Sequence, residues 1–309
     1  MKQRIARTRG VKGAASWCAL AAFIYLFLKN LLAVGVSFLM NLRVEGASLA
    51  DPVGFSGTAA IFLEMLVGIG AIVLPLFWLL RTTRLVPEDL RVILPAPWSP
   101  LFCLSVFLGI ANAGNLFGGL LARLIGVTKE MTVLPAAGSE LFAYFLSLCV
   151  MPAIVEELFF RGALQGLMRP SGSAAAMFAP ALLFALLHQD LAQGITAFVC
   201  ALFLGWLAER SGSILPGMLL HFVNNCLAFL SLYLRLFAPS NISLAYELLL
   251  LIGFPLLALW LVWFAERRGF RFSAGLRPGV GPLAVFTSPV YSVAVVFLIV
   301  LAVYARQLG

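Results

Sequence analysis

Charged residues are scarce in this sequence. Aspartate, glutamate, lysine and arginine make up 11% of its 309 residues, whereas hydrophobic residues make up 62%. Soluble globular domains contain about 45–50% apolar and about 25% charged residues. The composition therefore excludes an ordinary soluble domain and predicts a polytopic membrane protein.

Cysteine and histidine are also sparse, which restricts metal and redox chemistry. No two of the five cysteines have the spacing of a zinc site or a redox motif, and all five lie within apolar stretches. We interpret them as small residues packed between helices. The chain has only two histidines, His188 and His221, so any histidine chemistry depends on these two.

The net charge of +8 does not indicate nucleic-acid binding. The basic residues stand between apolar stretches and do not form one basic face, a pattern that membrane topology explains. We expect the lipid bilayer, and no nucleic acid, as the partner of this surface.

Nine apolar stretches follow one another at short spacing, and a membrane-spanning helix needs about 20 such residues. They cover approximately residues 14–40, 58–80, 101–121, 139–167, 174–188, 195–208, 214–236, 242–264 and 283–304. The fifth and sixth are too short for full spans, so we expect their ends to lie inside the protein and line a cavity. The sequence predicts an all-α transmembrane bundle of eight or nine spans, with short or broken helices around a buried polar site.

The arginines predict which end of this bundle faces the cytoplasm. The connections after the second, fourth, sixth and eighth stretches hold nine arginines, and the opposite connections hold only Arg43, Arg123 and Lys129. Because cytoplasmic loops carry the excess of lysine and arginine, we expect a multi-pass protein of the cytoplasmic membrane with its N-terminus inside. Residues 1–13 would form a basic cytoplasmic segment, and residues 14–309 one membrane-embedded domain.

Three charged residues, whose insertion into a bilayer costs the most free energy, lie together in the fourth stretch. Glu156, Glu157 and Arg161 fall within six residues, and each charge at a bilayer centre costs ~2.5–3.5 kcal/mol on insertion scales. Such charges need partners or a water-filled pocket and indicate a functional site. Helical spacing places Glu157 and Arg161 on one face, where they can pair, and directs Glu156 about 100° away.

The same spacing joins Phe184 to His188 in the fifth stretch and His221 to Asn225 in the seventh. A free carboxylate that activates water, together with imidazole and amide donors that hold an oxyanion, suffices for amide hydrolysis without a covalent intermediate. Two histidines and one glutamate would also make a three-ligand zinc site. A zinc-dependent hydrolase therefore stays open as an alternative, although no His-Glu-x-x-His motif is present.

Three motifs in this order resemble the CAAX prenyl endopeptidase and bacteriocin-processing (CPBP, or Abi) family, over about residues 150–230. They are Glu-Glu-x-x-x-Arg (Glu156, Glu157, Arg161), Phe-x-x-x-His (Phe184, His188) and His-x-x-x-Asn (His221, Asn225).

The resemblance implies a role for each motif residue within a catalytic core at about residues 139–236. Glu156 would activate the attacking water with His188 assisting, and His221 and Asn225 would stabilise the oxyanion. The other two charged residues of the first motif would orient the site and balance its charge. The implied activity is that of a glutamate-dependent intramembrane protease without a metal cofactor, acting on a protein or peptide that carries a lipid anchor or a transmembrane tail.

Two other classes of protein compete with this interpretation. One is a non-catalytic membrane scaffold or immunity protein of the same fold, and the other is a transporter in which Glu156 and the histidines relay protons. We expect Asn224 to be a helix-packing contact, because only Asn225 has the four-residue spacing from His221. Glu64 and Glu247 lie near predicted span ends and are interpreted as structural.

Overall fold

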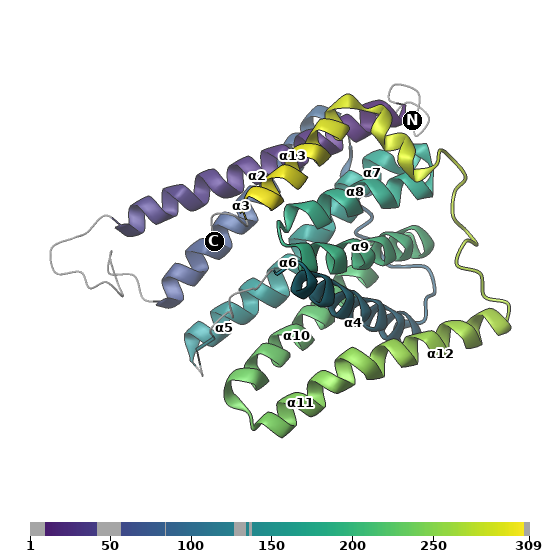
Figure 1. The fold of residues 1–309 in the computed structure, drawn as a ribbon. Coiled ribbons are helices and arrows are strands. Elements are labelled where there is room, and N and C mark those ends of the chain that lie inside the picture. The colour runs from purple at the N-terminus through teal and green to yellow at the C-terminus, as the bar shows by residue number, and fades with distance from the viewer. Residues whose placement is uncertain (1–9, 42–56, 84, 127–133, 136–137, 306–309) are drawn as a thin grey trace.

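The computed structural model describes residues 10–41, 57–83, 85–126, 134–135 and 138–305. All regular elements within these residues are helices, which confirms the predicted all-α class (Figure 1). Residues 1–9 of the expected basic N-terminal segment lie outside the described part of the chain.

Seven helical segments within the described residues are long and apolar enough to cross a membrane. They are α2 (Val11–Asn41), α3 (Gly57–Thr83), α4 (Pro100–Leu124), the run Ser139–Ser171, α9 (Leu191–Ser211), α10 (Leu215–Phe237) and the run Ser240–Arg267. Two shorter apolar helices are α8 (Ser173–Leu187) and α13 (Pro289–Ala305). These nine segments correspond to the nine predicted stretches.

The expectation that the sixth stretch is too short to cross the membrane is wrong. Helix α9 has 21 residues because it extends past both ends of its apolar stretch. At its start, the Asp190 side chain caps the helix by accepting a hydrogen bond from the backbone N–H of Gln193 at 2.6 Å. At its end, Gly212 takes a left-handed conformation with φ of 70°. Helix α8, with 15 residues, is short as predicted.

The run Ser139–Ser171, which carries the acidic motif, changes its winding several times. It consists of α5 (Ser139–Phe145), η2 (Leu146–Val150), α6 (Met151–Glu156), η3 (Glu157–Leu164), α7 (Gln165–Met168) and η4 (Arg169–Ser171). Both η2 and η3 are π-helical, a winding that is rare in general and frequent at functional sites. The acidic motif therefore sits where an α-helix turns into a π-helix.

The run Ser240–Arg267 is also built from several pieces and packs beside α4. It comprises α11 (Ser240–Leu248), η5 (Leu249–Gly253) and α12 (Phe254–Arg267). Two short 3-10 turns complete the described elements, η1 (Pro87–Leu90) and η6 (Pro282–Thr287). In Figure 1, α2, α3 and α13 form one side of the molecule, α4, α8 and α9 form its centre, and α10 to α12 form the other side.

Small residues let the central helices approach each other closely. A Cβ atom added at Gly118 of α4 would lie 2.6 Å from the carbonyl oxygen of Ala192 in α9, and one at Gly114 would lie 3.1 Å from the Cα of Thr196. Four of the five cysteines are buried and Cys226 is partly buried, and all are free thiols. The glycine contacts between α4 and α9 are the small-residue packing by which membrane helices associate without a hydrophobic driving force between them.

Candidate active site

Residues from each of the three motifs come together around one cavity of about 330 Å³. Its walls include the four residues that the sequence indicates for catalysis, contributed by α6, by the end of α8 and by α10: Glu156, His188, His221 and Asn225. The short helix α8 ends at this cavity, so His188 stands at a helix terminus inside the bundle. Segments far apart in the sequence thus bring a carboxylate, two imidazoles and an amide together.

Glu157 is completely buried and lies between two partners. Its Oε1 is 2.8 Å from Arg161 Nη1, which is the ion pair that the four-residue spacing predicts. The same oxygen is 3.0 Å from His221 Nδ1, a contact between helices that spacing within one helix does not reveal. Because a carboxylate only accepts hydrogen bonds, His221 donates from Nδ1 and turns its Nε2 toward the cavity.

Glu156 has different surroundings from those of its neighbour. Its side chain is 21% exposed, and its Oε2 lies 3.9 Å from His221 Nε2. That distance is too long for a direct hydrogen bond and leaves room for a bridging water or a substrate atom. Glu156 is therefore the carboxylate of the pair that a small molecule in the cavity can reach.

His188 is held by the residue one helical turn before it. Its Nδ1 lies 2.7 Å from the backbone oxygen of Phe184, so Nδ1 carries the proton and Nε2 is left as an acceptor. The Phe184 ring packs against the His188 ring with centroids 4.7 Å apart, and the Arg161 guanidinium lies over the same phenyl ring at 4.8 Å. Phe184 thus fixes the position of both a histidine and the buried cation.

Asn225 is anchored to the backbone of the helical run that carries the acidic motif. Its Nδ2 donates to the backbone oxygen of Leu148, within the π-helical η2, at 3.1 Å. An amide nitrogen has two hydrogens, so Asn225 can hold Leu148 with one and direct the other elsewhere.

No group of three histidine, cysteine, aspartate or glutamate side chains among the described residues is arranged to hold a metal ion. One nitrogen of each histidine is engaged, by Phe184 and by Glu157 respectively. The other nitrogen of each ring is left for a water, a substrate atom or another ligand.

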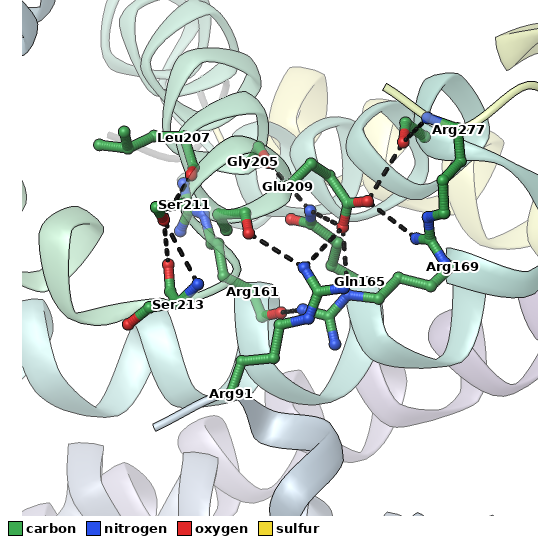
Figure 2. A network of polar contacts seen from close by, with 12 residues as sticks. Arg91, Arg161, Gln165, Arg169, Gly205, Leu207, Glu209, Ser211, Ser213 and Arg277 are labelled. Carbon is green, nitrogen blue, oxygen red and sulfur yellow. Dashed lines mark hydrogen bonds and ion pairs between the residues drawn. The ribbon is translucent and has the colours of Figure 1, made fainter. Parts of the chain in front are cut away.

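A second buried carboxylate, not singled out by the sequence, lies at the end of α9 (Figure 2). The Glu209 side chain is only 2% exposed and forms ion pairs with Arg277 at 2.8 Å, Arg169 at 3.1 Å and Arg91 at 3.6 Å. It also accepts a hydrogen bond from Gln165 at 3.0 Å. The available signal in the sequence was a single acid, followed by Arg210, in a short connection between two apolar stretches.

This network is connected to the acidic motif through the backbone. Gln165 and Arg169 belong to the same helical run as the two motif glutamates, and Arg169 Nη2 donates to the backbone oxygen of Arg161 at 3.2 Å. We call Glu209 and its four partners Arg91, Gln165, Arg169 and Arg277 the Glu209 cluster. Through Arg169, this cluster stabilises the helical segment that carries Arg161.

The helical bundle and its polar cavity define a multi-pass membrane protein. Residues 138–227 match a family model described as type II CAAX prenyl endopeptidase Rce1-like. The matched segment contains all three motifs, and the match confirms the resemblance to the CPBP family. No curated protein and no solved structure matches the chain.

Proposed function

We propose that this protein is a glutamate-dependent endopeptidase that hydrolyses a peptide bond in a membrane-associated or lipid-modified protein or peptide. The observation that carries the proposal is the separation of the two glutamates. Glu157 is buried in an ion pair, whereas Glu156 faces a cavity shared with His188, His221 and Asn225. A polar cavity in an apolar bundle has the groups that water activation needs.

In the proposed reaction, Glu156 takes a proton from a water held in the cavity, and the resulting hydroxide attacks the carbonyl carbon of the scissile bond. The free Nε2 of His188 helps to orient this water. The proton then passes to the leaving amine as the C–N bond breaks, so that one water is consumed and no covalent enzyme intermediate forms.

The oxyanion that forms on the substrate is stabilised by α10. Asn225 contributes the second hydrogen of its amide, and His221 contributes an Nε2–H. For His221 to donate from both nitrogens the ring carries two protons, and the Glu157 carboxylate at Nδ1 and the oxyanion at Nε2 balance that charge.

The test is hydrolysis of a synthetic peptide with a farnesylated cysteine by the purified protein in liposomes. Glu156→Gln, His188→Ala and His221→Ala are each expected to lower the rate by at least about 10²-fold, the lower range for general acid–base groups. Glu64→Gln, on an exposed position of α3, is the matched control and should leave the rate unchanged. If all three site variants kept full cellular function, a scaffold role would replace proteolysis.

We also propose that the reaction uses no metal ion. Dialysis against a chelator should then leave the hydrolysis rate unchanged. Activity that disappears on chelation and returns with Zn²⁺ would establish the zinc-dependent alternative.

We further propose that the arginine-rich end of the bundle faces the cytoplasm, with the protein in the cytoplasmic membrane. In Figure 1, α7 and the C-terminal ends of α9 and α12 lie on the same side of the bundle, and the start of α11 lies on the opposite side. In a Cys226→Ala background, a membrane-impermeant maleimide should label Ser240→Cys in intact cells and Arg268→Cys only in inverted vesicles. The opposite labelling would reverse the orientation.

A further inference from the structure

The catalytic cavity continues well beyond the residues of the three motifs. A second hollow of about 550 Å³ shares His188, His221 and Asn225 with it and extends to Asn115 of α4 and Asn224 of α10. A third, of about 640 Å³, shares these two asparagines with the second and reaches the far part of α10. The three adjoining hollows form one groove, which we call the asparagine groove, between α10 on one side and α4 and the run Ser240–Arg267 on the other.

The length of this groove follows from the helix that lines it. Its walls include His221 near the start of α10 and Arg235 near the end. These positions are separated by 14 residues, or about 21 Å at 1.5 Å per residue. At the far end, Arg235 and Ser231 bind the carboxylate of Glu247, so this acid is structural, as expected from the sequence.

The asparagine groove has polar amide side chains in its walls, although it lies within an apolar helical bundle. Asn115 has an exposed side chain that makes no hydrogen bond within the described residues. Within the same residues, the side chain of Asn224 makes one long hydrogen bond, 3.5 Å from its Nδ2 to Asn225 Oδ1. Both amides therefore keep donor and acceptor capacity that a polar occupant of the groove can use. The expectation that Asn224 is a packing contact does not account for its position in the walls of two hollows.

The chemistry of the occupant follows from the amides. Isoprenoid and acyl chains have no donors or acceptors, whereas an extended polypeptide presents an N–H and a C=O at each residue. A carboxamide both donates and accepts, which matches a peptide backbone. At about 3.3 Å per extended residue, 21 Å accommodates about six residues.

We propose that the asparagine groove binds an extended segment of the substrate polypeptide on one side of the scissile bond, with Asn115 and Asn224 hydrogen-bonding its backbone. This inference rests on the proposed proteolytic function and adds a specificity element to it. Because the asparagines contact backbone groups, they select for the length of an unfolded segment and only weakly for its sequence.

The test measures the binding of peptides to the Glu156→Gln protein, which does not require turnover. Two nested series of fluorescent peptides, each with one farnesylated cysteine, are lengthened one residue at a time on either side of a fixed central bond. Affinity should rise with length in one series and reach a plateau at about six residues. In the Asn115→Leu/Asn224→Leu background this gain should fall by about tenfold, as expected for two lost hydrogen bonds, while the shortest peptides bind equally to both proteins.

Matched variants separate the groove from general effects of the substitutions. Asn30→Leu, on an exposed position of α2 that is absent from the groove walls, should leave the length dependence intact. Asn115→Ala/Asn224→Ala removes the same amides with less added bulk and should reproduce the loss. Affinity that does not change with length, or a gain that survives both double variants, would overturn the proposal. Phospholipid that copurifies with the parent protein and is lost from the double variants, without any effect on peptides, would assign the groove to lipid instead.

The same peptides distinguish this proposal from the proteolytic function on which it rests. If the wild-type protein cleaves none of them but length-dependent binding depends on the asparagines, proteolysis is wrong and the groove binds peptide for another purpose. If cleavage is normal in the double variants at every length, proteolysis holds and the groove proposal is wrong.

Discussion

Glu156 and Glu157 are adjacent in the chain, yet their side chains meet opposite environments. Glu157 is completely buried against Arg161 and His221, whereas Glu156 reaches the cavity. A buried charge is tolerated only with compensating partners, so Glu157 and Arg161 depend on each other for their place in the bundle. Glu156 has no such tie and is available for chemistry.

Arg161→Met should destabilise the protein by about 3–5 kcal/mol, because it leaves Glu157 buried without its cation. Adding Glu157→Gln in the same chain removes the unpaired charge and should recover most of that loss. Hydrolysis should stay low in the double variant, since His221 loses the carboxylate that holds its Nδ1. Thermal unfolding in detergent, with peptide hydrolysis measured on the same samples, tests both parts. A double variant as unstable as the single variant would show that the pair does not act as a unit.

At the scale of elements, the positions of the site residues depend on departures from regular helices. The Leu148 carbonyl lies in the π-helical η2 and accepts a hydrogen bond from Asn225 of α10. Helix α4 approaches α9 closely because glycines replace larger side chains at their contact. These two features position α10 against the run Ser139–Ser171 and α4 against α9.

Neighbouring glycines of α4 offer a matched comparison of this contact. A Cβ at Gly118 would lie 2.6 Å from the Ala192 backbone oxygen, whereas one at Gly119 would meet nothing within 4 Å. Gly118→Ala is therefore expected to destabilise the protein by about 1–3 kcal/mol through forced separation of the helices. Gly119→Ala should be neutral or stabilising by up to about 1 kcal/mol, the difference in helix propensity. Equal unfolding temperatures for the two variants in detergent would contradict the close contact.

At the scale of the whole molecule, the Glu209 cluster joins distant parts of the chain at one end of the bundle. It links α9 to the helical run of the acidic motif and to the segments that carry Arg91 and Arg277 (Figure 2). A single carboxylate thereby forms ion pairs with three cations that come from three separate segments. Helix α9 can continue into this region because the arginines form ion pairs with Glu209, the one acidic residue of the helix.

Glu209→Gln should destabilise the protein by about 2–3 kcal/mol, since three arginines lose their shared carboxylate. This is less than for a fully buried pair, because Arg91 and Arg277 reach solvent. Glu266→Gln, an exposed acid near the same end, is the control and should change stability by less than about 0.5 kcal/mol. Thermal unfolding of both variants in the same detergent provides the measurement. An unfolding temperature for Glu209→Gln equal to that of the parent would show that the cluster is not structural.

The sequence by itself determined the features that depend on local patterns. Hydropathy located nine apolar segments, and helical spacing predicted the Glu157–Arg161 pair and the shared face of His221 and Asn225. These predictions succeeded because a hydrophobic run and a four-residue spacing act within one helix.

Only the tertiary structure decided which helices meet and where polar residues find partners. The contact from Glu157 to His221, the anchoring of Asn225 by Leu148 and the gathering of three arginines on Glu209 all join separate segments. For the same reason the hydropathy pattern cut α9 short, because Glu209 at its end counts as a break until its partners are known. Packing between helices fixes these contacts, and a single sequence does not state its interhelical distances.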